Sequence, residues 1–150
     1  MIYDPEEVGI MLRNVIPDAL KQENERTGDF QDFELWRVLV VQIAKQIVIN
    51  YKCSLVVPMT LKKKVYFDYI YEGLRSIDDN TYCFCLTASF DCIHKRLEER
   101  GDKLGSWAYN QTEDCLIAYA SDYFGEYIDT EKISIKETVD YIIGKLGLVQ

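Results

Sequence analysis

Hydrophobic residues recur at intervals of three and four along most of the chain, which is the spacing that places them on one face of a helix. The clearest case begins at Phe33, continues through Trp36 and Val40, and ends at Tyr51. Shorter stretches of the same kind follow polar residues that favour helix starts. The pattern predicts six helices, over about residues 5–16, 33–51, 61–75, 90–100, 107–121 and 135–146.

Four short apolar runs lie between these helices and are typical of buried strands. They are Met1–Tyr3, Cys53–Val57, Thr81–Leu86 and Glu126–Ile128. Cys53–Val57 is stopped by Pro58 and reads as a central strand of a parallel sheet. Strands that alternate with helices predict an α/β fold with a parallel sheet and right-handed crossovers.

Polar residues at the helix starts refine these boundaries. Asp4 and Ser89 are predicted N-caps, and Ser134 with Glu137 forms a predicted capping box. Asp32 is predicted to cap the longest helix. The last helix carries one apolar stripe, which we expect to pack against the core, and its members are Ile135, Val139, Ile142, Ile143 and Leu146.

Thr60 and Lys62–Lys64 follow the predicted central strand. Ligands of open α/β folds bind just beyond such strand ends, so Thr60 either contacts a ligand or caps the next helix. The three lysines oppose the dipole of that helix. A solvated face and an anionic ligand are both compatible with them.

Composition limits the class of protein. The chain has 150 residues, 48% of them hydrophobic, which is enough for the core of one domain. No run approaches the roughly 20 apolar residues that a transmembrane helix needs, and the start is acidic where a signal peptide would be basic. We therefore expect a single cytoplasmic domain, residues 1–150, without a transmembrane segment.

The cysteines and the single histidine indicate no metal site. Five cysteines are an odd number, and most lie in apolar segments, which favours reduced, buried thiols. Cys83 and Cys85 flank Phe84 in an alternating strand, and His94 is the only histidine, so no zinc ligand set is complete.

A basic cluster interrupts an acidic chain. The net charge is −8, which disfavours general nucleic-acid binding, yet His94–Arg96, Arg100 and Lys103 fall close together. Arg96 and Arg100 are four residues apart and share one helix face, where two guanidinium groups can grip phosphate oxygens. A solvated face paired with acidic neighbours is the alternative.

The segment around these arginines resembles the lid of small P-loop kinases. Arg96–Gly101 and Ser106–Gln111 look most like the lid of the tunicamycin resistance protein family. Further matching pieces occur from end to end of the chain, and they are Tyr3–Gly9, Asp29–Asp32, Val56–Thr60 and Ile128–Thr130.

This resemblance implies a three-layer parallel sheet of the P-loop kinase type, with a lid over about residues 96–111. The family's Gly-x-x-x-x-Gly-Lys-Ser/Thr motif does not occur in the sequence, since the single Gly-Lys pair, Gly144-Lys145, is followed by Leu146. The expectation is therefore a domain that lacks the first, central strand and the P-loop. Truncation, divergence and completion by a partner all remain open.

For the intact family the resemblance implies binding of ATP and Mg²⁺, and either phosphoryl transfer to tunicamycin-like nucleoside antibiotics or their sequestration. Asp4, Arg96 and Arg100 would be catalytic, and Lys95 with Arg96 would contact the nucleotide. The remaining expected substrate contacts are Asp29, Gln31, Asp32, Thr60, Trp107, Tyr109 and Gln111. We expect this chain to be inactive in phosphoryl transfer. The alternative is a non-catalytic module that keeps the acceptor-binding half and dimerises through open sheet edges.

Overall fold

The computed structural model describes residues 1–147 and groups them into two compact units. Unit 1 comprises Met1–Leu61 and Val65–Thr81, and unit 2 comprises Lys62–Lys64 and the chain from Tyr82 onward. The expectation of a single domain stays a prediction. Among the described residues, no helix is both long and apolar enough to cross a membrane.

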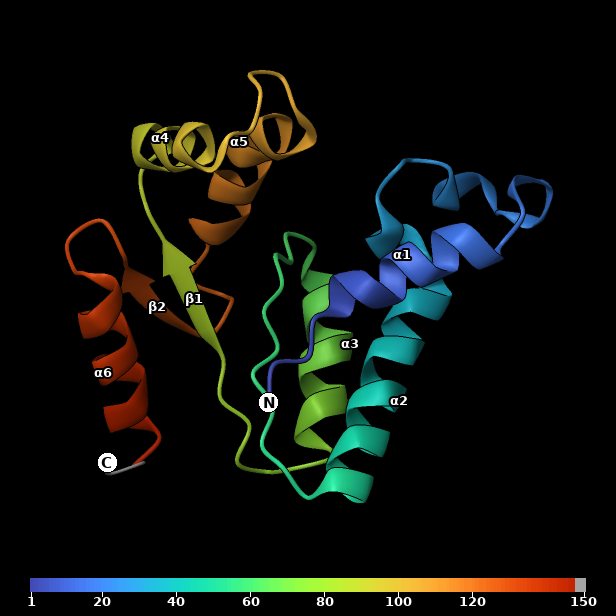
Figure 1. Ribbon diagram of the computed structural model, residues 1–150, viewed down its shortest axis with the longest axis horizontal. Coiled ribbons are helices and arrows are strands. Elements are labelled where there is room, and N and C mark those ends of the chain that lie inside the picture. The colour runs from blue at the N-terminus through green and yellow to red at the C-terminus, as the bar shows by residue number, and fades with distance from the viewer. Residues whose placement is uncertain (148–150) are drawn as a thin grey trace. The chain divides into compact units, whose positions relative to one another are not determined.

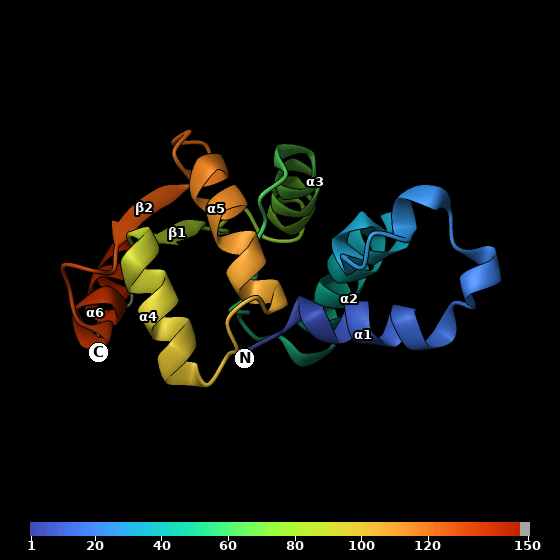
Figure 2. The same ribbon diagram turned by 90° about the horizontal axis from the view of Figure 1, so that it is seen from above.

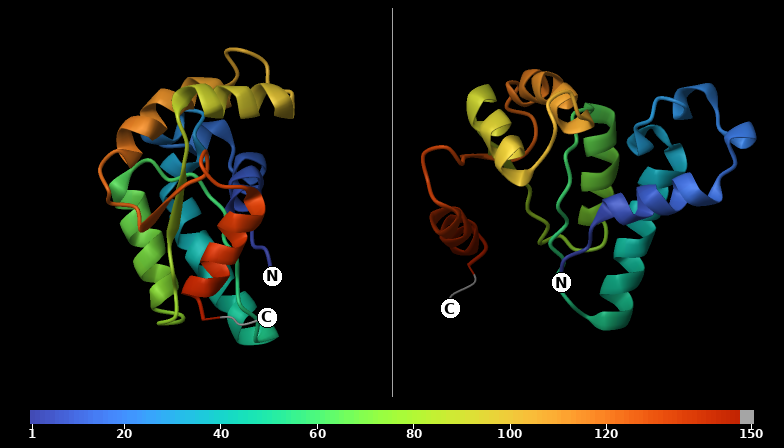
Figure 3. Two further views of the ribbon diagram at one scale, coloured as in Figure 1. Left: turned by 90° about the vertical axis from the view of Figure 1, so that its left-hand side faces the viewer. Right: turned by 45° about the horizontal axis from the view of Figure 1, so that its top comes forward.

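Unit 1 is built on three α-helices, α1 (Pro5–Val15), α2 (Glu34–Tyr51) and most of α3 (Lys64–Arg75), with three short 3-10 helices between α1 and α2. The predicted cap of α1 is confirmed, because Asp4 Oδ1 accepts a hydrogen bond from the backbone N–H of Glu6 at 2.9 Å. The right-hand view of Figure 3 shows α1 crossing α2.

The core of unit 1 lies where α1 and α3 meet α2. Trp36 is 1% exposed and donates its indole N–H to the carbonyl of Pro5 at 2.9 Å, which fixes α1 against α2. On the other side of α2, a Cβ built on Gly73 of α3 would lie 2.6 Å from Cγ2 of Val41, so the absence of a side chain lets the helices approach. Figure 1 shows α2 and α3 side by side.

Two predicted helix starts in unit 1 are wrong. The N-cap of α2 is Phe33, and Asp32 instead ends the 3-10 helix Phe30–Asp32, where its side chain is buried. Helix α3 begins at Lys64 rather than near Leu61, so Thr60 caps no helix. Leu61 is buried at 7% exposure, and the chain stays non-helical as far as Lys63.

The predicted central strand Cys53–Val57 is also wrong. It forms one isolated parallel bridge, between Val56 and Ile2, with Tyr3 N–H donating to Val56 O at 2.9 Å and Val56 N–H donating to Met1 O at 2.8 Å. Val56 is 64% exposed. Within the described chain this segment is bridged on one side, by Ile2, and forms no strand, so its apolar composition does not make it a central strand.

Unit 2 contains a two-stranded parallel sheet and three helices. Strand β1 (Phe84–Thr87) pairs with β2 (Glu126–Asp129), and Phe84 lies opposite Glu126. The helices are α4 (Phe90–Arg100), α5 (Trp107–Tyr119) and α6 (Ile135–Lys145). Figure 2 shows α4 and α5 side by side. The mixed α/β class and the parallel pairing agree with the sequence prediction.

Local signals place the ends of the helices in unit 2. Ser89 caps α4 by accepting from the N–H of Cys92 at 3.3 Å, and Gly101 ends α4 with φ +93°, a conformation that favours glycine. The capping box of Ser134 and Glu137 at α6 is confirmed. The apolar stripe of α6 is less buried than expected, since Ile135 is 85% exposed.

Candidate functional site

A buried carboxylate forms the centre of the candidate site in unit 1. Asp32 is 7% exposed and accepts hydrogen bonds at both oxygens, from the Thr27 hydroxyl at 2.7 Å and from the Tyr66 hydroxyl at 2.6 Å. These two hydroxyls come from the loop before α2 and from α3. They fix the carboxylate in place and replace the water that burial removes.

The 3-10 helix that ends at Asp32 joins two more polar residues to this carboxylate. Gln31 donates its side-chain amide to the carbonyl of Thr60 at 2.7 Å, which ties the loop before α2 to the segment before α3. Asp29 caps the 3-10 helix by accepting from Gln31 N–H at 2.9 Å, and its own N–H donates to Thr27 Oγ1 at 3.1 Å. We call Thr27, Gln31, Asp32, Thr60 and Tyr66 the Asp32 cluster.

Charge beside the Asp32 cluster comes from Arg37 on α2. Its guanidinium carbon lies 4.5 Å from the centre of the Tyr66 ring, in cation–π contact. A cationic group and a carboxylate thus flank the same tyrosine.

Four of the expected acceptor residues come together here, namely Asp29, Gln31, Asp32 and Thr60. Asp4 is not bonded to them within the described chain, since its side chain caps α1. Sequence reasoning missed Thr27 and Tyr66. Thr27 lies in a polar stretch between the predicted helices 5–16 and 33–51, and Tyr66 lies 34 residues from Asp32 in a helix whose apolar spacing gives no sign of the contact.

An open hollow of about 410 Å³ is lined by Arg13 of α1 and by residues 18–33 of the same loop. Arg13 donates to the carbonyl of Gly28 at its rim, and Arg26 donates to the carbonyl of Asp18 at 2.9 Å. The Lys21 ammonium hydrogen-bonds Asp18 and lowers the pKa of that carboxyl. The cations lining this hollow are therefore largely engaged with carbonyl and carboxylate oxygens of the loop itself.

In unit 2, the expected lid arginines bind separate partners. Arg96 donates to both the hydroxyl and the carbonyl of Thr130, each at 2.8 Å, and Thr130 Oγ1 donates to Thr87 O at 2.9 Å. The guanidinium thus ties α4 to the carboxyl ends of β1 and β2. Beside it, Ser89 N–H donates to the Glu131 carboxylate at 2.9 Å and lowers the pKa of that group.

Arg100 of the predicted lid and Lys95, which precedes the lid, are each paired locally. Arg100 donates to Asp102 at 2.5 Å, and this hydrogen bond lowers the pKa of Asp102. Lys95 lies 3.9 Å from Glu99 in an exposed ion pair. Arg96 and Arg100, which were predicted to share a helix face, therefore both have guanidinium groups that are already hydrogen-bonded.

Three of the expected substrate contacts, Trp107, Tyr109 and Gln111, lie at the start of α5. Trp107 is 54% exposed, whereas Tyr109 packs edge-on against His94 with ring centres 4.7 Å apart and donates its hydroxyl to the His94 carbonyl at 3.3 Å. Gln111 accepts from Lys62, which also pairs with Asp114 at 2.9 Å. Of the expected contacts, Trp107 is the aromatic group most open to a ligand.

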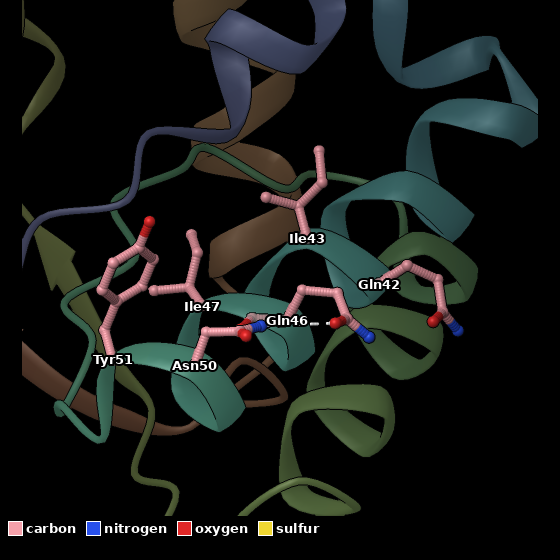
Figure 4. Close-up of a pocket in the computed structure, with 6 residues that line it drawn as sticks. All are labelled: Gln42, Ile43, Gln46, Ile47, Asn50 and Tyr51. Atoms are coloured by element: carbon pink, nitrogen blue, oxygen red, sulfur yellow. Dashed lines mark hydrogen bonds between the residues drawn. The ribbon is translucent and has the colours of Figure 1, made fainter.

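A hollow of about 610 Å³ lies along the second half of α2 and was not predicted. Figure 4 shows that all six lining residues come from this helix. They form two adjacent rows, one of amides and one largely apolar, and they are Gln42, Gln46, Asn50, Ile43, Ile47 and Tyr51. No charged side chain lines it.

Residues 1–147 contain no group of three or more histidine, cysteine, aspartate or glutamate side chains placed to hold a metal ion. The five cysteines are free. Burial raises the pKa of the Cys83 thiol to about 11, so this thiol is protonated at neutral pH.

Comparison with solved structures gives an informative likeness. The tunicamycin resistance protein of Deinococcus radiodurans superposes with a TM-score of 0.77 over 99% of this chain and 83% of that chain, at 22% sequence identity. The two chains share a fold. This likeness agrees with the resemblance read from the sequence motifs. No protein-family model matches the chain, and no curated protein matches it.

Proposed function

We propose that this chain is a resistance protein that binds tunicamycin-like nucleoside antibiotics through the Asp32 cluster of unit 1. The observation that carries the proposal is the shared fold with a tunicamycin resistance protein over 99% of the chain. The parallel contacts Ile2–Val56 and β1–β2 are compatible with a parent layout of the three-layer P-loop kinase type.

The chemistry of the Asp32 cluster suits a ligand rich in hydroxyl groups. An ionised carboxylate offers about four acceptor positions, and two of those on Asp32 are taken by Thr27 and Tyr66. A sugar or nucleoside hydroxyl is a donor that a carboxylate oxygen can accept. Gln31 and Thr60, at the more exposed side of the cluster, supply further polar contacts.

Sequestration of the ligand fits these residues better than phosphoryl transfer. Arg96 and Arg100, the expected phosphate contacts, are already bonded to Thr130 and Asp102. The 150 residues also contain no Gly-x-x-x-x-Gly-Lys-Ser/Thr motif, whose backbone amides and lysine grip a triphosphate. The residues present therefore do not fit ATP with Mg²⁺ as a tightly held group.

Calorimetry with tunicamycin tests the binding site. Replacing a hydrogen-bonded charged group costs about 1.5–3 kcal/mol, so Asp32→Asn should weaken tunicamycin binding roughly 10- to 150-fold. Tyr66→Phe should weaken it less. Asp79→Asn is the matched control, because Asp79 is an exposed residue of unit 1 outside the cluster. Unchanged affinity in a folded Asp32→Asn protein would contradict the proposal.

A second titration tests the role of ATP. We expect a dissociation constant for ATP with Mg²⁺ no tighter than about 1 mM, equivalent to about −4 kcal/mol. Micromolar binding would overturn this expectation. In that case Arg96→Ala and Arg100→Ala would show whether the lid residues supply the affinity.

A further inference from the structure

Arg37 differs from the other arginines of the chain in the partner of its guanidinium group. The sequence contains six arginines. Five of them donate to, or pair with, an oxygen of the chain, and they are Arg13, Arg26, Arg75, Arg96 and Arg100. Arg37 instead contacts the ring of Tyr66, with its guanidinium carbon 4.5 Å from the ring centre. Within residues 1–147 it forms no hydrogen bond and no ion pair, so its charge is not matched by an oxygen of unit 1.

The side chain of Arg37 is held by α3 rather than by its own helix. Glu34 lies three residues earlier on α2, a spacing that allows an ion pair, yet the two side chains do not pair in the described chain. The guanidinium reaches the Tyr66 ring instead, and the Tyr66 hydroxyl donates to Asp32 at 2.6 Å. Asp32 thus fixes the ring and the ring fixes the cation, so the guanidinium is in place before any ligand arrives.

The N–H groups of Arg37 are available to a bound molecule. A guanidinium has five N–H donors and no acceptor, and contact with the face of a ring bonds none of them to an oxygen. The side chain is half-buried, but its nitrogens are not among the buried polar atoms that lack a partner in the described residues, so they reach solvent. Five unused donors beside the Asp32 cluster indicate that a ligand supplies the acceptor.

An oxyanion is the acceptor that suits a guanidinium best. The planar group matches the oxygens of a phosphate or a carboxylate with two parallel hydrogen bonds. A phosphate monoester carries about −1.5 to −2 charges near pH 7, more than a carboxylate. The net charge of −8 repels such a ligand from the chain as a whole. A preference for a phosphorylated ligand would therefore have to come from a local cation such as Arg37.

We propose that Arg37 binds the phosphate of a phosphorylated nucleoside and thereby determines which nucleosides the Asp32 cluster prefers. The hydroxyl groups of the ligand lie at the Asp32 cluster, and its phosphate lies at the guanidinium on the face of the Tyr66 ring. The inference rests on the proposed nucleoside site of unit 1. It adds that this site favours a nucleoside with a phosphate over the same nucleoside without one.

Calorimetry with uridine and uridine 5′-monophosphate tests the proposal, because these two molecules differ in the phosphate alone. We expect the wild-type chain to bind the monophosphate about 10-fold more tightly, and we call this ratio the phosphate preference. No binding of the monophosphate, or equal affinity for both molecules, would overturn the proposal. Inorganic phosphate alone should bind more weakly than the monophosphate. Equal affinity for these two would show a site for free phosphate and would also overturn the proposal.

Substitutions of Arg37 test whether this residue supplies the preference. Arg37→Gln should reduce the ratio to about 1 and leave the affinity for uridine unchanged. Arg37→Lys keeps the charge but loses the paired donors, so part of the preference should remain. If Arg37 only held α2 to α3, Arg37→Gln would weaken the binding of both molecules equally, and the proposal would be wrong. Circular dichroism verifies that each variant is folded.

Arg75→Gln is the matched control. Arg75 also lies against a tyrosine ring of unit 1, 5.9 Å from the centre of Tyr71, but its guanidinium pairs with Glu72 at 3.8 Å. This variant loses the same charge and should keep the full phosphate preference. An equal loss of preference in Arg75→Gln and Arg37→Gln would show a general effect of charge and would overturn the proposal.

The proposed antibiotic site and the phosphate preference can fail separately. Tyr66→Phe keeps the ring under Arg37 but removes the bond to Asp32, so it should weaken uridine and its monophosphate by the same factor and leave their ratio unchanged. Tunicamycin binding without a phosphate preference would refute the role of Arg37 alone. An Arg37-dependent phosphate preference without tunicamycin binding would refute the antibiotic as ligand and leave the role of Arg37 standing.

Discussion

The two units bury apolar surface to very different extents. In unit 1, Trp36, Val40 and Ala44 of α2 are at most 1% exposed, and helices from both sides cover them. In unit 2, the buried hydrophobic residues of the described chain are Cys85, Phe124 and Ile128, at 5–6% exposure. Eight further hydrophobic residues of unit 1 are buried, and Leu12, Phe33 and Ile70 among them are at most 2% exposed.

The difference follows from the architecture of each unit. A helix with a wide apolar stripe, such as α2, can be covered by helices on two sides and fills a core by itself. A two-stranded sheet has little face to bury, and three or more strands are normally needed for independent stability. Unit 2 accordingly leaves Leu86, Ile117 and Ile135 more than half exposed. We infer that unit 1 supplies most of the stability of the chain.

The largest expected effect compares the two tryptophans of the chain, one in each unit. Trp36→Ala should lower the free energy of unfolding by about 3–5 kcal/mol, because it leaves a cavity between α1 and α2. Trp107→Ala should change it by less than about 0.5 kcal/mol, because Trp107 is 54% exposed. Denaturant titration followed by circular dichroism measures both. Equal losses in the two variants would contradict the assignment of the main core to unit 1.

A smaller effect compares two helical glycines. Gly73→Ala in unit 1 should destabilise the chain by about 1–3 kcal/mol, because its Cβ would meet Val41 at 2.6 Å. A Cβ built on Gly144 in unit 2 meets nothing within 4 Å. Gly144→Ala should therefore stabilise α6 by about 0.5–1 kcal/mol. Thermal melts measure the opposite signs. Val41→Ala should relieve part of the cost of Gly73→Ala, whereas an independent, additive loss would refute the close packing of α3 on α2.

Weakening the two hydrogen bonds from Arg96 to Thr130 should have a smaller effect still on the free energy of unfolding. Arg96→Lys keeps the charge but cannot reproduce two directed hydrogen bonds to one residue, so we expect a loss of about 0.5–1.5 kcal/mol. Lys95→Arg, on the neighbouring exposed position, should be neutral within about 0.5 kcal/mol. If Arg96→Lys proves as neutral as this control, Arg96 does not hold α4 to the strand ends.

Local signals in the sequence predicted much of this fold. Asp4, Ser89 and the Ser134–Glu137 box cap the helices as expected, because a cap depends on residues within one turn of each other. The parallel relation of β1 and β2 also agrees with the alternation of strands and helices. Such features can be predicted without knowing which distant segments of the chain contact each other.

Non-local contacts account for the errors. Cys53–Val57 has the composition of a central strand, but its neighbours are decided by tertiary pairing, and Ile2 alone bridges it in the described chain. Asp32 has the sequence position of a cap, yet its side chain bonds Thr27 and Tyr66. Capping and tertiary hydrogen bonding use the same oxygen atoms, so the sequence alone cannot decide between them.

The smallest expected effect is electrostatic and again differs between the units. In unit 2, the backbone N–H of Ser89 lowers the pKa of Glu131, and in unit 1, a hydrogen bond from Lys21 lowers the pKa of Asp18. A carboxyl whose pKa is lowered on folding stabilises the fold above its ordinary pKa, about 4, and this contribution is lost as the pH falls through the lowered value. Carboxyl titration by ¹³C NMR should therefore give midpoints below the ordinary values for both groups.

Salt distinguishes the two causes. Added salt screens the attraction between exposed charges, so 1 M NaCl should raise the Asp18 midpoint toward its ordinary value. A backbone N–H carries no net charge, so the Glu131 midpoint should move less. The Ser89 amide shift should follow the Glu131 titration and lose that pH dependence in Glu131→Gln. An Asp18 midpoint that ignores salt, or a Ser89 amide that titrates without Glu131, would show that the two carboxylates are held in ways other than these hydrogen bonds.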